Sequence, residues 1–379
     1  MKVALLSDCY LPRLGGIEVQ VHDLAGALRR AGHDVEVFTA TTGPSGERRG
    51  ACLVEDEVPV HRMAIALPGG IPVNPFAPPE VRRRLSDGGF DVAHVHMGVV
   101  SPFATDMARV TLGIGLPTAI TWHCVIDRSA PVFRALGQPR RWAAKGAALS
   151  AVSTMAADRV RQVAGRDVEV GVLGNGIDAA TWARPAGLAP RDPSGPVHVV
   201  SALRLARRKR PLAALGVLRR ARELLDPAVP LTATLLGEGP QRMVLERYLA
   251  QHAMGWVSLP GRVGRDELRE MHWDADVYLS TTRLEAFGLA ALEARTAGLP
   301  VVARRGTGAD DFVEDGVAGL LAGDDEGLAE AVARLAADPL LRARVAEHNR
   351  STPPEQDWPR AVEATLGEYA RAIRAQGRS

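Results

Sequence analysis

Cysteine, lysine and long apolar runs are scarce in this chain of 379 residues. Its three cysteines, Cys9, Cys52 and Cys124, include no Cys-x-x-Cys pair, which argues against a disulfide framework or a structural zinc site and fits a reducing compartment. The apolar run after Met1 is too short for a signal peptide, and no run reaches the length of a membrane span. We therefore expect a cytoplasmic protein.

The chain also lacks an excess of charge of either sign. Its 46 Lys and Arg against 44 Asp and Glu give a net charge of +2, which does not indicate a nucleic-acid partner. Lysine occurs only as Lys2, Lys145 and Lys209, and Lys209 lies within an arginine-rich run. A lysine kept among arginines suggests that a compact charge is needed there, as in phosphate neutralisation, although a solvated basic loop is the alternative.

The length favours two domains. Short apolar runs alternate with helical periodicity along the whole chain, which predicts α/β domains with parallel sheets. A Pro/Gly-rich segment near Pro190 is the expected linker, giving domains of residues 1–190 and 191–357. The last helix, about residues 358–379, could pack on either domain, including back on the first.

The most informative segment is 280–293, in which Glu285 and Glu293 lie eight residues apart around the expected start of a helix. The backbone N–H groups of 287–289 would form the helix N-terminus, which attracts an anion such as a diphosphate. Carboxylates accept hydrogen bonds from sugar hydroxyls. The segment thus predicts a site for a phosphorylated sugar, although a capping acid followed by a solvated glutamate is the simpler alternative.

Two further motifs limit the possibilities. Gly15 and Gly16 follow the first expected strand and open a helix, where paired glycines allow close approach to the backbone. Neither domain opening carries Gly-x-Gly-x-x-Gly, which argues against a nicotinamide dehydrogenase. Asp274-Ala275-Asp276 precedes its strand, so we interpret it as a turn and not as a metal site.

With these motifs in place, the chain resembles glycosyltransferase family 4, and its opening glycine loop is similar to that of members that mannosylate phosphatidylinositol. The resemblance covers nearly the whole chain. The matching segments are Glu285-Ala286-Phe287-Gly288-Leu289 with Glu293, Ala297–Val302, Gly15-Gly16-Ile17-Glu18, Thr121-Trp122-His123, Asn175-Gly176-Ile177-Asp178, Arg204 with Lys209, and Gly261-Arg262-Val263. It implies two facing Rossmann-like domains of the GT-B architecture, with a cleft between them, and a retaining transfer of a hexose-type sugar from a UDP- or GDP-sugar to an acceptor hydroxyl.

The resemblance also implies how the departing diphosphate is stabilised. Arg204 and Lys209 would neutralise its growing charge, and helix N-termini and the backbone of Gly15 and Gly16 would add oriented dipoles. No metal is expected, and no cofactor other than the nucleotide-sugar donor.

The remaining implied roles concern recognition of the donor. Glu293 would bind the ribose hydroxyls and Glu285 the sugar hydroxyls, while His123 would hydrogen-bond the sugar and Val263 would face the base. The amides around Phe287, Gly288 and Leu289 would complete the donor site. No carboxylate is an obvious nucleophile, and the resemblance implies a reaction on one face of the sugar in which the leaving phosphate itself takes the acceptor proton.

Two departures from the family pattern affect loops. Arg210 stands where the family usually has glycine after the lysine, and Gly306-Thr307-Gly308-Ala309-Asp310-Asp311 replaces a Gly-Gly-x-x-Glu loop. Loop geometry and donor choice are therefore open at this point.

The acceptor, a lipid or a small molecule, is also open. An arginine-rich and aromatic face including Arg82–Arg84, Phe133, Arg134, Trp142 and Lys145 could rest on anionic lipid at the inner membrane face, although solvated arginines are the alternative. Two other functions stay open as well: a nucleotide-sugar 2-epimerase and a non-catalytic sugar- or nucleotide-binding protein.

Overall fold

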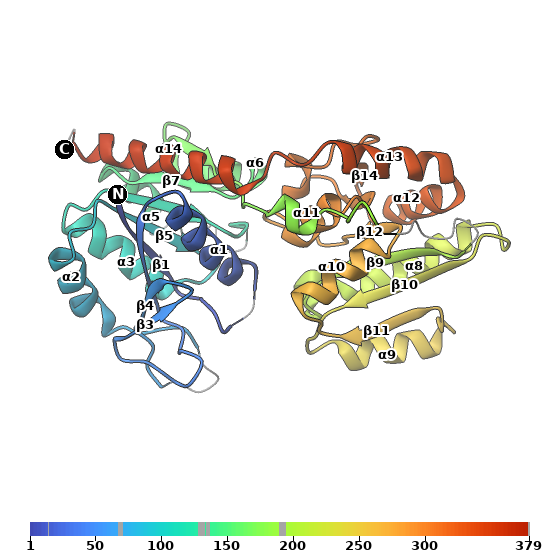
Figure 1. Cartoon of the computed structure of the whole chain (residues 1–379), viewed down its shortest axis with the longest axis horizontal. Coiled ribbons are helices and arrows are strands. Elements are labelled where there is room, and N and C mark those ends of the chain that lie inside the picture. Colours follow the sequence, from blue (N-terminus) through green and yellow to red (C-terminus); the bar gives the residue numbers. More distant parts are fainter. Residues whose placement is uncertain (14, 67–70, 128–132, 134–136, 189–194, 378–379) are drawn as a thin grey trace. The chain divides into compact units, whose positions relative to one another are not determined.

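The computed structural model describes residues 1–13, 15–66, 71–127, 133, 137–188 and 195–377, and divides into two compact units (Figure 1). The first comprises Met1–Gly176 and Gln356–Ser379, and the second Ile177–Glu355. The predicted boundary at residue 190 lies outside the described residues, and the division comes before it. Helix α7 (Ala179–Trp182) already belongs to the second unit, because the Trp273 indole donates a hydrogen bond to the Trp182 carbonyl at 3.0 Å.

The first unit is built on an eight-stranded sheet in the order β3-β4-β2-β1-β5-β6-β7-β8. Its strands are β1 (Lys2–Ser7), β2 (Asp34–Thr39), β3 (Ala51–Glu55), β4 (Val58–Arg62), β5 (Val92–Met97), β6 (Thr118–Trp122), β7 (Ala148–Ala151) and β8 (Val170–Val172). All neighbouring pairs are parallel except β3 and β4. The sheet departs from the expected parallel pairing at this edge, because Asp56 and Glu57 both take positive φ and form the tight turn of a hairpin.

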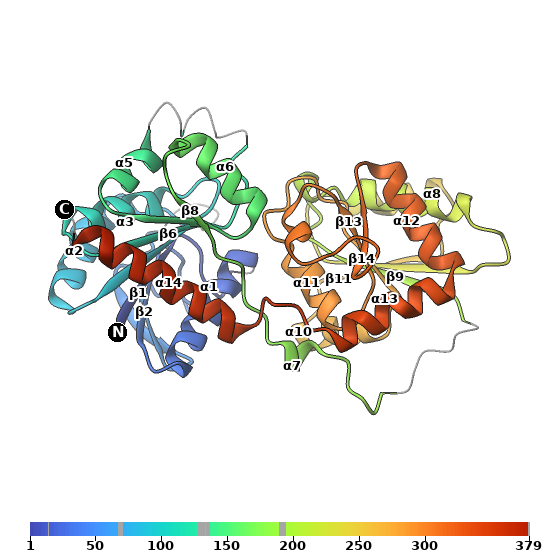
Figure 2. The same ribbon diagram turned by 90° about the horizontal axis from the view of Figure 1, so that it is seen from above.

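Helices cover both faces of this sheet. They are α1 (Gly16–Arg30), α2 (Ala77–Asp87), α3 (Pro102–Gly113), α5 (Gln138–Ala144), α6 (Thr154–Ala164) and α14 (Trp358–Gln376). Alternate residues of β1 point to opposite faces: Val3 and Leu5 pack with α1 and α14, whereas Ala4 and Leu6 pack with α2 and α3. The terminal helix α14 therefore lies beside α1 on the first unit (Figure 2).

The second unit has a six-stranded parallel sheet in the order β11-β10-β9-β12-β13-β14. Its strands are β9 (Val197–Ala202), β10 (Leu231–Leu236), β11 (Val257–Gly261), β12 (Val277–Leu279), β13 (Val301–Arg304) and β14 (Gly319–Ala322). Besides α7, its helices are α8 (Pro211–Leu224), α9 (Arg242–Gln251), α10 (Arg265–Trp273), α11 (Leu289–Thr296), α12 (Asp325–Ala337) and α13 (Pro339–Ser351), with short 3-10 turns η2 (Arg207–Lys209) and η3 (Gly308–Asp311). Two α/β units confirm the predicted fold class.

The strand order reverses once in each unit. From β9 the chain proceeds outward through β10 and β11, then returns to the other side of β9 with β12. In the first unit, the corresponding reversal lies between β1 and β5. The crevice beyond the carboxyl ends of such strands is where open α/β sheets bind ligands. Among the described residues, no helix is long and apolar enough to cross a membrane.

Candidate functional site

Lys209 and Glu285 meet where the strand order of the second unit reverses. Lys209 ends η2, which follows β9, and Glu285 lies in the loop after β12, the parallel neighbour of β9. The Lys209 ammonium lies 2.5 Å from a carboxylate oxygen of Glu285, and both side chains are half-buried. The fold thus brings together two predicted site residues that are 76 positions apart.

Glu293 lies in the helix that follows the carboxyl end of β12. It is buried in α11, which begins at Leu289 after Gly288 takes a left-handed conformation with φ of 96°. The buried Tyr278 on β12 links the two acids: burial, followed by the negative charges of Glu285 and Glu293, raises the pKa of its hydroxyl. Both carboxylates therefore lie close enough to act on one side chain.

The start of α11 is held by contacts that the sequence did not reveal. The Gly308 N–H donates to the Glu285 carbonyl at 2.9 Å, and a Cβ added at Gly308 would come within 2.2 Å of the Ala286 carbonyl oxygen. The rings of Phe287 and Phe312 pack with centroids 5.4 Å apart. The departure from the family pattern at 306–311 thus forms a turn that packs directly against the segment carrying Glu285.

Arg204 and Val263 follow the carboxyl ends of two strands of the second sheet, β9 and β11. Arg204 follows β9, is exposed, and forms no ion pair with any residue that the structure describes. Its loop rests on Gly237 and Gly239 after β10: a Cβ at Gly237 would lie 2.0 Å from the Leu203 carbonyl oxygen, and one at Gly239 would lie 2.5 Å from the Leu205 carbonyl oxygen. Val263 is half-buried beyond β11. A Gly-x-Gly directly after a strand was the signal that could have identified this support.

The predicted residues of the first unit follow β1 and β6. Gly15 is the N-cap of α1 in an extended conformation, and a Cβ there would meet the Glu18 carboxylate at 2.4 Å. A Cβ at Gly16 would meet nothing within 4 Å, so packing within the described residues does not require glycine there. This openness is compatible with the predicted approach of another group to the Gly16 backbone.

His123, at the end of β6, is part of a chain of histidines. Its Nε2 lies 2.9 Å from Nδ1 of the buried His96, and burial lowers the pKa of His123 to about 4. Burial also lowers the pKa of His96, so both rings are neutral near pH 7 and one must donate to the other. His96 could not be identified as a partner of His123 from the sequence, because the two strands become neighbours only in the folded sheet.

The structure alters the expected basic and aromatic face. Trp142 is buried in the first core and packs near Trp122, so it is not available to a lipid surface. Arg83 and Arg84 are paired with Glu80 on the same helix. Phe133 packs against the core, and Arg134 lies outside the described residues.

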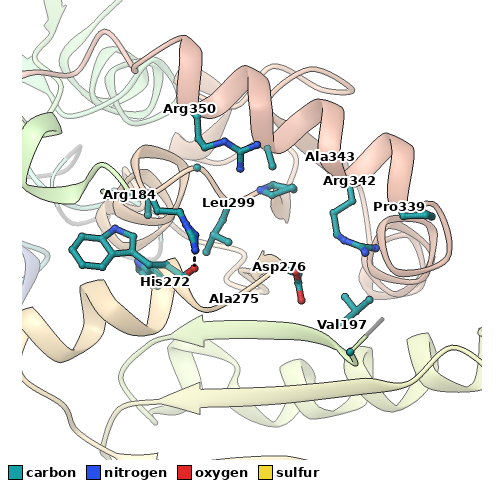
Figure 3. Close-up of a pocket in the computed structure, with 16 residues that line it drawn as sticks. Arg184, Val197, His272, Ala275, Asp276, Leu299, Pro339, Arg342, Ala343 and Arg350 are labelled. Carbon is teal, nitrogen blue, oxygen red and sulfur yellow. Dashed lines mark hydrogen bonds between the residues drawn. The ribbon is translucent and has the colours of Figure 1, made fainter. Parts of the chain in front are cut away.

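A hollow lies elsewhere in the second unit, away from these residues. Its volume is about 290 Å³, and Val197, Ala275 and Leu299 line it at or before the starts of β9, β12 and β13 (Figure 3). This is the opposite end of the strands from Lys209. The arginines around it already have partners: Arg184 donates to the Trp273 carbonyl, Arg342 donates to the carbonyls of Leu335 and Ala336, and Arg350 pairs with Glu347.

The Asp274-Ala275-Asp276 motif lies at this same end. An Asp276 carboxylate oxygen accepts a hydrogen bond from the His198 N–H at 2.8 Å, next to the start of β12. Its position at the amino end of the sheet matches the interpretation of the motif as a structural turn.

Two family models match most of the chain. The model of Glycosyltransferase Family 4 matches residues 14–181, and that of Glycosyl transferases group 1 matches residues 190–352. The chain is a family 4 glycosyltransferase. The D-inositol 3-phosphate glycosyltransferase of Pseudarthrobacter chlorophenolicus is 28% identical to it, with 95% of this chain and 91% of the relative covered.

Other relatives of this glycosyltransferase extend along its whole length. The GDP-mannose-dependent alpha-mannosyltransferase of Mycobacterium tuberculosis is 27% identical, covering 99% of this chain and 98% of the relative. HepE of Anabaena, solved in complex with UDP, superposes with a TM-score of 0.75 at 20% identity, covering 98% of this chain and all of that one. These similarities confirm the predicted GT-B fold and glycosyltransferase activity.

Proposed function

We propose that this glycosyltransferase moves a hexose-type sugar from a UDP- or GDP-sugar to an acceptor hydroxyl, with retention of the anomeric configuration and without a metal. The observation that carries the proposal is the Lys209–Glu285 contact next to the start of α11, where β9 and β12 part. At the carboxyl ends of these two strands, it combines a cation for phosphate, a carboxylate for hydroxyls and helix N–H groups for an anion.

In the proposed reaction, the bond between the anomeric carbon and the diphosphate oxygen breaks as the acceptor oxygen attacks from the same face. The acceptor proton passes to the leaving phosphate oxygen. Lys209 and Arg204 offset the charge that grows on the phosphate, and the α11 N-terminus adds its dipole. Because cationic side chains supply this stabilisation, the proposal needs no divalent ion.

The other predicted residues keep recognition roles in this proposal. Glu293 binds the ribose hydroxyls and Glu285 binds the sugar hydroxyls, since carboxylates accept hydrogen bonds. His123 contributes its Nδ1, because its Nε2 is shared with His96. Val263 faces the base, and Gly16 offers a backbone that a phosphate can approach closely.

The names of the relatives indicate which donors and acceptors to test. HepE was solved with UDP-glucose, and the Mycobacterium mannosyltransferase is named for GDP-mannose, so both nucleotides belong in the test. We propose a small hydroxylated acceptor, because one relative is named for inositol 3-phosphate. The scarcity of cysteine suits a cytoplasmic reaction.

The test is a matrix of UDP- and GDP-hexoses against inositol 3-phosphate, simple glycosides and phosphatidylinositol vesicles, with magnesium or with EDTA. We expect nucleoside diphosphate release that depends on one acceptor and is unchanged by EDTA, and a product whose anomeric configuration matches the donor by NMR. Inversion would refute retention, and loss of activity in EDTA would refute metal independence.

Incubation with the donor alone separates the alternatives. An isomerised nucleotide sugar formed without acceptor would identify a 2-epimerase. Tight nucleotide binding with no turnover on any acceptor would favour a binding protein.

A further inference from the structure

Arg210 has a backbone conformation that normally belongs to glycine. It lies between η2 and α8 with φ of 57° and ψ of 45°, in the left-handed region. A side chain is disfavoured there, whereas glycine adopts it freely. An arginine at this position therefore calls for contacts that compensate for the backbone strain.

The Arg210 guanidinium supplies such contacts. Its two terminal nitrogens lie 2.9 Å and 2.6 Å from the two carboxylate oxygens of Asp325, in the first turn of α12. The same fork donates to the Thr281 carbonyl at 3.0 Å. Arg304 shares Asp325 at 2.9 Å, and the hydrogen bond from Arg210 is the main reason that the Asp325 pKa is lowered. This bidentate geometry fixes orientation as well as distance.

The backbone on either side of the Lys209–Arg210 peptide is tied to the end of β12. The Thr281 hydroxyl donates to the Arg210 carbonyl at 3.2 Å, and the Thr282 hydroxyl donates to the Lys209 carbonyl at 3.3 Å. Three residues beyond Thr282, Glu285 receives the Lys209 ammonium. The Arg210 guanidinium and these two hydroxyls thus hold the loop that carries Lys209 against α12 and the end of β12.

We propose that Arg210 is a positioning residue, whose grip on Asp325 and on the Thr281 carbonyl sets where the Lys209 ammonium stands relative to Glu285 and the start of α11. The inference rests on the proposed function of that site. Two residues of the basic run 207–210 therefore have different roles: Lys209 is the cation that meets the donor diphosphate, whereas the charge of Arg210 is paired with Asp325. The loop is consequently anchored to α12 and does not rely on a glycine turn.

The experiment compares Arg210→Gly, Arg210→Lys and Asp325→Asn with a matched control, Arg220→Gln. Arg220 on α8 pairs with Glu326 on α12 at 2.7 Å, so the control removes another ion pair to α12 without touching the loop. Arg210→Gly keeps the backbone conformation accessible and removes only the fork. Nucleoside diphosphate affinity by calorimetry and kcat/KM for the donor are the readouts.

We expect Arg210→Gly and Asp325→Asn to lower donor kcat/KM by about tenfold to a hundredfold, the scale of misplacing a reacting group by about 1 Å. Nucleoside diphosphate affinity should weaken in parallel. Arg210→Lys should recover part of the loss, because a lysine reaches Asp325 without forming a fork. Arg220→Gln should leave both readouts unchanged.

A double-mutant cycle tests whether Arg210 acts through Lys209. In a Lys209→Ala background, Arg210→Gly should have no further effect on kcat/KM or on nucleoside diphosphate affinity. Additive losses, or a wild-type value for Arg210→Gly, would overturn the inference. A wild-type protein that binds neither UDP nor GDP would overturn the proposed function instead, so the two failures are distinguishable.

Discussion

Lys209 shows what a single residue contributes to this site. Its rarity among arginines marked it in the sequence, but its partner Glu285 could not be inferred from local pattern, because the contact depends on β9 and β12 being neighbours. In the proposed reaction, the ammonium turns from the carboxylate to the anionic diphosphate when the donor binds. Glu285 is then released to accept hydrogen bonds from the sugar.

Replacing Lys209 by alanine should lower kcat/KM by about two to three orders of magnitude, the usual effect of removing one preorganised electrostatic contact. Steady-state kinetics with the donor found in the substrate matrix provides the measurement. Lys145→Ala is the matched control, since Lys145 is exposed in the first unit and should leave the rate unchanged. Near-normal activity of Lys209→Ala would remove the proposed role.

Asp8, at the end of β1, is a second residue with a distinct electrostatic state. It is buried, and its carboxylate accepts the N–H groups of Phe103 and Ala104 at the start of α3 at 3.0 Å and 3.2 Å. Burial raises its pKa to about 6 despite these hydrogen bonds. The folded protein therefore holds this proton more tightly than the unfolded chain does.

Stability contributed by Asp8 should be greatest below about pH 4 and should be lost as pH rises through about 6, by about 3 kcal/mol in total. Asp8→Asn stays neutral at every pH. The free energy of unfolding of this variant, minus that of the wild type, should therefore rise by about 3 kcal/mol between about pH 4 and 7. Guanidinium unfolding at three pH values measures the difference. Parallel curves for the two proteins would contradict the raised pKa.

The loops that carry the site are shaped by glycines whose neighbours are distant in sequence. Most strands and helices could be predicted, because apolar runs and Gly/Pro punctuation are local signals, as in β1 and α8. The β3–β4 hairpin was missed, since β3 is an edge strand with alternating exposure. Gly237 and Gly308 are confined by the carbonyls of Leu203 and Ala286, and only the folded chain reveals such neighbours.

Gly308→Ala tests the support of α11. The added methyl would lie against the Ala286 carbonyl and force η3 away, so we expect a loss of about 1–3 kcal/mol in the free energy of unfolding, together with weaker nucleoside diphosphate binding. Chemical unfolding and calorimetry measure the two effects. Gly323→Ala is the control, because a Cβ there would meet nothing within 4 Å.

The first unit is completed by a helix from the far end of the chain. Tyr369 on α14 is fully buried, and its hydroxyl lies 3.0 Å from Nδ1 of His94 on β5. The other ring nitrogen of His94 lies 2.7 Å from the Thr121 hydroxyl. The sequence left the place of this helix open, since its own pattern does not say which sheet it covers.

Tyr369→Phe should leave the buried Nδ1 of His94 without a partner and lower the free energy of unfolding of the first unit by about 1–3 kcal/mol. Hydrogen exchange followed by mass spectrometry should show faster exchange in β5, β6 and α14. The second unit serves as an internal control, and its exchange should not change. Uniform acceleration across both units would contradict a local role for the hydroxyl.

The position of α14 has a consequence for biosynthesis. A ribosome produces residues 1–176 before the second unit, but the helix that shares one face of their sheet with α1, residues 358–376, is translated only after the whole second unit. During elongation, the apolar side chains that later meet α14 have no cover from it. The nascent second unit, continuous in sequence, can mature earlier, so the part of the enzyme made first is the last to be finished.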